Sequence, residues 1–244
     1  MNWVIARITL RQLLSRRRTL LLLLLGGVLV LAAGIFRLAG EEARALPFTA
    51  GLLSNLGIGT LMPLVALIFG TGAIGAEIED GTAIFLLAKP IRRATVVLTK
   101  LAVAAVCAAA LTCGPMLLAG VIAAGGLGDG LVLGMVAGAA IGSILYASVF
   151  LALSLVTGRA LVFGLGYVLI WEGLLAGLFA GTRTFSVRQL TLSFADAIGG
   201  IRADIFDAPV GLTTAVVVGI ALLVLTTGIA IRRLSGFEIS GEAA

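Results

Sequence analysis

The sequence contains no histidine, only two cysteines, and few charged side chains for its length. Of its 244 residues, 12% are charged and 60% are hydrophobic, and the mean hydropathy is +1.19. Soluble domains average about 45–50% apolar and about 25% charged residues. The composition therefore excludes a soluble globular domain and places the chain in a membrane. With no His, and with Cys107 and Cys113 in one apolar stretch, the sequence offers neither a metal cluster nor a disulfide framework.

Long uncharged stretches predict an all-α polytopic membrane protein with one transmembrane domain over residues 1–244. A bilayer core about 30 Å thick needs about 20 apolar residues per helix, so six such runs and their connections use the whole chain. The second and third runs are too long for one straight crossing, and Pro63 and Pro115 predict kinks in them. The six predicted transmembrane helices are residues 19–36, 48–76, 94–124, 131–157, 160–180 and 209–231.

Basic residues predict the orientation of these helices, because cytoplasmic flanks of membrane spans are enriched in Lys and Arg. With the N-terminus inside, twelve of the 17 basic residues fall on inner segments and five on outer ones. Both termini are therefore predicted to be cytoplasmic, in the cell's inner membrane. The formal net charge of +5 is a signal of this topology, since no nucleic-acid-binding motif accompanies it.

Two segments outside the spans have amphipathic patterns. Residues 1–18 place Trp3, Ala6, Leu10, Leu13 and Leu14 at helical spacing, with arginines on another side, which predicts an interfacial elbow helix against membrane lipid. The alternative is a plain extension of the first span. Residues 181–208 alternate apolar residues with Arg and Asp, which predicts one or two amphipathic helices that lie on the outer surface or dip back into it.

The connection over residues 77–93 combines dense charge with an apolar turn. Thr82 can cap a short helix and Pro90 ends it, so residues 83–89 are predicted to form about two turns on the cytoplasmic side. This helix exposes Ile84, Phe85 and Leu86. Burying a side chain of that size stabilises by roughly 1.5–3 kcal/mol, so the helix is expected to dock. Composition alone leaves open whether it docks on lipid or on a partner protein.

The same connection resembles the signature loop of type-2 ABC exporter permeases. That family carries E-x-E-x-G-T followed by L-L-x-x-P-[IV]-x-R between its second and third helices, and this chain shows the pattern with Lys100 downstream. The resemblance implies a coupling helix that sits in a cleft of an ATPase subunit. The residues it assigns to ATPase coupling are Glu77, Glu79, Asp80, Gly81, Thr82, Ile84, Phe85, Leu86, Lys89, Pro90, Arg92 and Arg93.

The resemblance also implies partners and cofactors. Two ATPase copies would hold ATP and Mg, a second permease chain would complete a homodimer or heterodimer, and this chain would hold no cofactor and catalyse no reaction. The sequence has no G-x-x-x-x-G-K-[ST] phosphate-binding loop, which fits a chain energised by a separate subunit. A secondary transporter would instead show inverted repeats and several intramembrane ionisable groups, and an intramembrane enzyme would need a nucleophile with a base.

Glycines and one acid mark the later spans. Glu172 lies about 18 Å into the fifth span at 1.5 Å per residue, where an acid is costly and suggests function. It would line the translocation route or position the dimer, or else be a protonated side chain bonded to a neighbouring Ser, Thr or backbone group. Glycines at every fourth position predict close helix packing or a dimer seam; they are Gly130, Gly134, Gly138, Gly142, Gly173 and Gly177.

Overall fold

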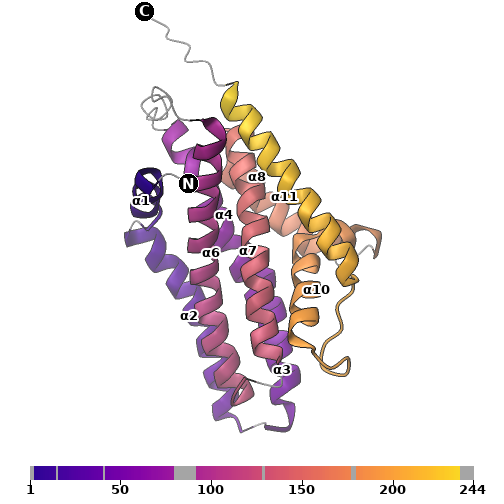
Figure 1. Ribbon diagram of the computed structural model, residues 1–244. Coiled ribbons are helices and arrows are strands. Elements are labelled where there is room, and N and C mark those ends of the chain that lie inside the picture. Colours follow the sequence, from indigo (N-terminus) through magenta and orange to yellow (C-terminus); the bar gives the residue numbers. More distant parts are fainter. Residues whose placement is uncertain are drawn as a thin grey trace, which may run out of the picture.

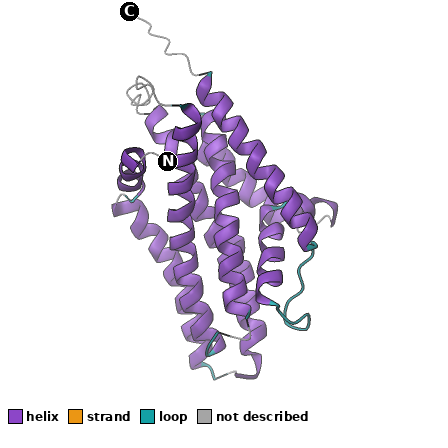
Figure 2. Ribbon diagram, viewed as in Figure 1, coloured by secondary structure: helices purple, strands orange, loops and turns teal. Residues whose placement is uncertain are grey.

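The computed structural model describes residues 3–14, 16–40, 42–79, 92–127, 130–176 and 180–236. Every regular element in these ranges is a helix (Figure 2), so the prediction of an all-α fold is confirmed. The elements are α1 Trp3–Leu13, α2 Arg16–Leu38, η1 Glu42–Arg44, α3 Ala45–Leu52, η2 Leu53–Leu61, α4 Met62–Glu79, α6 Arg93–Ala124, α7 Leu131–Val156, α8 Ala160–Gly166, η3 Tyr167–Leu175, η4 Ala180–Phe185, α10 Val187–Gly199 and α11 Leu212–Ser235.

The helices form an elongated bundle around α7, which contacts α4, α6, α10 and α11. In Figure 1, the end of α4, the start of α6 and the C-terminal end of α11 lie together at the top, and we call this end the loop end. The side chains of Met135, Tyr146 and Phe150 on α7 are fully buried. By contrast α2 and α11 have large exposed apolar faces, as expected for helices that contact lipid.

The second predicted span is helical from Ala45 to Glu79, longer than the predicted 48–76, and its middle segment η2 is a π-helix. Pro63 lies two residues after the end of this segment and has no N–H to donate to Gly59. A widened turn just before a proline removes the clash that a regular α-helix would suffer. The distortion predicted at Pro63 is therefore a π-helical segment ahead of it, whereas α6 continues through Pro115 to Ala124.

Five helices in the described ranges are long and apolar enough to cross a membrane, and the fifth predicted span is not among them. That span consists of α8 and the π-helix η3, which together cover only Ala160–Leu175, or about 24 Å at 1.5 Å per residue. Residues 177–179 lie outside the described ranges. The count of six spans stays a prediction.

Arginines do not end helices where the sequence pattern predicted. Helix α11 begins at Leu212 and continues through Arg232 and Arg233 to Ser235, because arginine is a good helix former and its charge suits the C-terminal turn. At the other end of the chain, Arg16–Arg18 form the first turn of α2. The chain changes direction just before these arginines, between α1 and α2 (Figure 1).

Helix α1 is separate from α2 and packs against α6. Its buried residues are Ile5, Ala6, Thr9 and Leu13, whereas Trp3 is 74% exposed. Of the predicted apolar face, Ala6 and Leu13 are buried against the protein, whereas Trp3, Leu10 and Leu14 are exposed. Contact of these exposed side chains with lipid stays a prediction.

The segment predicted to be amphipathic over residues 181–208 contains the short helix η4 and then α10, which packs against α7 and α11. In Figure 1, α10 lies beside the half of α7 that is away from the loop end. Its buried side chains include Val187, Leu190 and Leu192. Helix α10 thus turns back into the bundle, one of the two arrangements that its pattern allowed.

Candidate functional site

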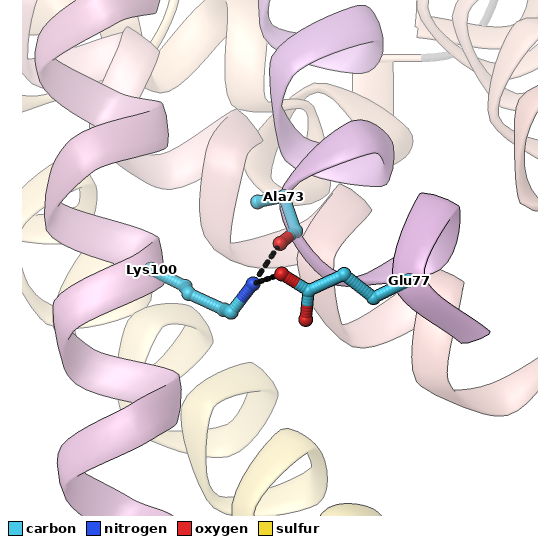
Figure 3. A network of polar contacts seen from close by, with 3 residues as sticks. All are labelled: Ala73, Glu77 and Lys100. Atoms are coloured by element: carbon cyan, nitrogen blue, oxygen red, sulfur yellow. Dashed lines mark hydrogen bonds and ion pairs between the residues drawn. The ribbon is translucent and has the colours of Figure 1, made fainter. Parts of the chain in front are cut away.

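A buried ion pair joins the two helices that flank the predicted coupling loop. Lys100 on α6 is 1% exposed and its Nζ donates to Glu77 Oε1 at 2.6 Å. The same Nζ donates to the backbone carbonyl of Ala73 at 2.6 Å. Figure 3 shows the lysine side chain extending from α6 to α4, where it meets both acceptors.

This ion pair constrains the base of the loop. Charged hydrogen bonds are about twice as strong as neutral ones, and removal of one partner from a buried pair costs about 3–5 kcal/mol because it leaves an uncompensated charge. Glu77 lies two residues before the end of α4 and Lys100 two turns into α6. The two ends from which the loop emerges are therefore held together by a strong polar contact.

The structure describes only part of the predicted coupling loop. Glu79 is the last residue of α4, Arg92 is an exposed residue ahead of α6, and Arg93 is the half-buried first residue of α6. The remaining predicted contact residues fall outside the described ranges; they are Asp80, Gly81, Thr82, Ile84, Phe85, Leu86, Lys89 and Pro90.

A second polar cluster surrounds Glu172, whose side chain is 2% exposed. Its Oε1 accepts a hydrogen bond from the Tyr167 hydroxyl at 2.9 Å and another from the Val187 backbone N–H at 2.9 Å. The Ser186 hydroxyl donates to Oε2. Ser186 is also the N-cap of α10, where its side chain accepts from the Gln189 N–H at 3.2 Å.

The π-helix η3 makes this geometry possible. In an α-helix, residues five apart point about 140° away from each other, but the wider turn of η3 brings Tyr167 and Glu172 into hydrogen-bond contact. Two of the three donors to Glu172, the Ser186 hydroxyl and the Val187 N–H, lie at the N-terminus of α10, an end that favours negative charge. Glu172 therefore ties η3 to α10 and satisfies the first backbone donor of that helix. Its partners are the Tyr167 and Ser186 hydroxyls and the Val187 backbone N–H. The predicted roles of Glu172, in the route, at the dimer or as a protonated side chain, stay predictions.

The predicted glycine series in α7 lies against α10 within the same chain. A Cβ on Gly134 would be 2.5 Å from the Ala195 carbonyl oxygen, and one on Gly138 would be 2.7 Å from the Ala195 Cβ. Gly130 and Gly142 are equally crowded by residues of α10. Small residues at these positions let the two helix backbones approach closely.

The later glycines of the predicted series behave differently. Gly173 on η3 is exposed, and a Cβ there would meet only the Val168 carbonyl oxygen at 3.6 Å. Gly177 lies outside the described ranges.

A cavity of about 320 Å³ lies near the loop end between α4, the end of α7 and the start of α8. Small and hydroxyl-bearing residues form much of its lining, among them Gly72, Gly75, Ser154, Thr157 and Gly158. Helix α4 therefore contributes to both features: Gly72 and Gly75 line the cavity, and Glu77 binds Lys100.

Sequence reasoning singled out Glu77, Lys100 and Glu172 but missed their partners. A lysine inside an apolar span requires a partner, and three acids, Glu77, Glu79 and Asp80, lie at the same membrane end. The sequence therefore indicates a partner among these acids but does not single out Glu77. The partners of Glu172 were not accessible from the sequence, because they depend on a π-helical turn and on the return of α10.

Comparison with known families identifies a relationship that covers most of the chain. The family model described as "ABC-2 family transporter protein" matches residues 13–182, which include α2, α4, α6, α7 and the Glu172 segment. No curated protein matches the chain significantly.

Proposed function

Since the chain belongs to the ABC-2 transporter family, as the match over residues 13–182 shows, we propose that it is the permease subunit of an ATP-driven exporter. It is a multi-pass membrane protein and a transport component. In the proposed complex a separate ATPase subunit binds and hydrolyses ATP, and this chain contributes the route and the contact that receives the motion. Two permease chains and two ATPase copies would make the working unit.

The observation that carries the coupling proposal is the Glu77–Lys100 ion pair. A loop that transmits a push from an ATPase must be anchored to helices that move together. The 2.6 Å contact between Lys100 Nζ and Glu77 Oε1 supplies such an anchor at the base of the loop. A displacement of the predicted coupling helix over residues 83–89 would then move α4 and α6 as one unit.

In the proposed topology the chain crosses the inner membrane of the cell six times, and both of its termini lie in the cytoplasm. The loop end, which carries Arg92, Arg232 and Arg233, would face the cytoplasm in agreement with the preference of basic residues for that side. Helix α1 would lie near the same interface as an elbow. The short α8–η3 segment would cross most of the bilayer, with α10 covering its outer part.

The proposed route follows the surface of α8 and η3. These helices have many exposed apolar residues, including Val162, Phe163, Leu169, Ile170 and Leu174. The cavity between α4, α7 and α8 opens at the cytoplasmic end of that surface in the proposed topology. A second permease chain facing it would enclose a passage that begins at this cavity.

Affinity purification of the full chain from its native membrane tests the proposal. We expect an ABC ATPase to co-purify in about equal amount and the eluate to hydrolyse Mg-ATP. Recovery of the chain without an ATPase, combined with transport in vesicles that lack ATP, would instead support a secondary transporter and overturn the proposal.

A further inference from the structure

Arg188, the second residue of α10, lies across the π-helix η2 and is held there by neutral groups. Its Nη2 donates to Asn55 Oδ1 at 2.8 Å and approaches the Ser54 carbonyl oxygen at 3.5 Å. A Cβ on Gly59 would be 3.1 Å from Arg188 Nε, so the absence of a side chain at Gly59 lets the guanidinium lie flat on the helix. The guanidinium is thus fixed in position by three residues of one element.

The charge of Arg188 has no carboxylate partner among the described residues. Glu172, the acid on the neighbouring η3, directs its two oxygens to Tyr167, Ser186 and Val187. The acceptors of Arg188 are an amide and a backbone carbonyl, neither of which carries charge. Its Nε is buried without a hydrogen-bond acceptor. A half-buried cation with only neutral partners has unused capacity for an anion.

The surface beside Arg188 is polar where a lipid-facing helix would be apolar. Asn55 and Thr60 are both exposed on η2, and the π-helical turn joins them, since the Thr60 hydroxyl donates to the Asn55 carbonyl at 3.2 Å. Polar side chains within membrane spans face a cavity or a ligand far more often than lipid, and π-helical turns occur often at functional sites. This surface therefore has the chemistry of a binding site.

Apolar groups adjoin the polar surface. Leu56 follows Asn55 on η2 and is 42% exposed. Phe185, the last residue of η4, lies two residues before α10 and is 66% exposed. A ligand that fills both parts carries an acidic group and an apolar body. We propose that Arg188, Asn55, Gly59 and Thr60 form a binding site for the phosphate or carboxylate group of an anionic amphiphile. That this amphiphile is the exported molecule rests on the proposed function.

Binding to the purified full chain in a neutral maltoside detergent tests the site. The probes are dioctanoyl phosphatidylglycerol and dioctanoyl phosphatidylcholine, which have equal chains and differ in net charge, and inorganic phosphate as an anion without a chain. We expect the wild-type chain to bind phosphatidylglycerol about tenfold more tightly than phosphatidylcholine, since a hydrogen bond to a charged group has about that effect.

The variants isolate the charge of Arg188 from its structural contacts. Arg188→Gln should bind phosphatidylglycerol and phosphatidylcholine with about equal affinity, so that the preference for the anionic lipid is lost. Asn55→Asp keeps the acceptor for Arg188 and the side-chain shape but neutralises the cation, so it should abolish the preference while the chain still folds. Arg202→Gln is the matched control, because Arg202 is an exposed arginine that contacts Asp204 instead, and it should keep the preference.

Displacement of bound phosphatidylglycerol by inorganic phosphate would show that the anion alone occupies the site, and its absence would show that the chain is also required; both support the proposal. Equal binding of the two lipids by the wild type, or an unchanged preference in Asn55→Asp, would overturn it. These measurements use the isolated chain, so their failure leaves ATPase co-purification, the test of the proposed function, unaffected.

Discussion

At the scale of single residues, two buried acids each hold a junction between helices. Glu77 accepts the Lys100 ammonium and joins α4 to α6. Glu172 accepts three donors and joins η3 to α10. Because both contacts are buried, a substitution that removes only one partner is costly. The remaining polar group stays buried without a hydrogen-bond partner or a counter-charge.

We expect Lys100→Met to lower the free energy of unfolding by about 3–5 kcal/mol, because Glu77 would remain near the protein interior without its cation. The double variant Glu77→Met with Lys100→Met should recover most of this loss. Thermal unfolding of the purified chain in detergent measures both. Equal destabilisation of the single and double variants would show that the pair does not act as a unit.

Glu172→Gln and Glu172→Ala should differ in their effect on stability. Glutamine can still accept from Val187 and Tyr167 and can donate to Ser186, so it can keep all three hydrogen bonds. Alanine leaves the Val187 N–H and two hydroxyls without their acceptor and should cost at least about 2 kcal/mol more than glutamine. Unfolding midpoints of the two variants test this order. A wild-type midpoint for Glu172→Ala would contradict the assigned contacts.

At the scale of elements, the sequence predicted the long helices well and the short ones less well. Uninterrupted apolar runs define α6 and α7 to within a residue or two of their bounds, because lipid demands such runs. The hydrophobic pattern of the sequence does not distinguish the π-helices η2 and η3 from α-helices. The end of the fifth span could not be predicted either, because it depends on how α10 packs. Arg232 and Arg233 mark the expected membrane boundary, but the helix itself continues past that boundary to Ser235.

The glycine series provides a matched pair of variants. Gly138→Ala would place a Cβ 2.7 Å from the Ala195 Cβ and 2.8 Å from the Thr191 carbonyl oxygen, and overpacking of this kind costs about 1–3 kcal/mol. Gly173→Ala meets only one atom at 3.6 Å and should be neutral or slightly stabilising. Unfolding midpoints separate the two. Equal midpoints would mean that α7 and α10 do not pack this closely.

At the scale of the whole molecule, the end of α4, the start of α6 and the end of α11 lie together at the loop end (Figure 1). Arg92 precedes α6, Arg232 and Arg233 lie in the last turn of α11, and the small-residue cavity is lined by α4, the end of α7 and the start of α8. The family resemblance, stated from residues 77–93 and Lys100, is confirmed by the match over residues 13–182. The structure adds that Glu77 and Lys100 contact each other. No sequence pattern could place α10 beside α7, since that return depends on tertiary packing.

Topology can be tested by cysteine labelling in a variant that lacks Cys107 and Cys113. A cysteine at exposed Ala203, in the loop after α10, should react with a membrane-impermeant maleimide added to intact cells. A cysteine at Ala244 should react only after the membrane is opened. The reverse pattern would contradict the proposed orientation.

One double variant tests whether this permease receives the motion of an ATPase through the loop over residues 77–93. Phe85→Ser with Leu86→Ser removes two apolar side chains from the proposed contact, which corresponds to roughly 3–6 kcal/mol or about two to four decades in affinity. The matched control is Trp3→Ser with Ile8→Ser, which changes two exposed apolar residues of α1.

Co-purification of the ATPase with each variant, at equal expression, is the measurement. We expect Phe85→Ser with Leu86→Ser to lose the ATPase while its unfolding midpoint stays near that of the wild type, and we expect the control to retain both the ATPase and the midpoint. Full recovery of the ATPase with the Phe85 and Leu86 double variant, together with normal transport, would contradict this expectation.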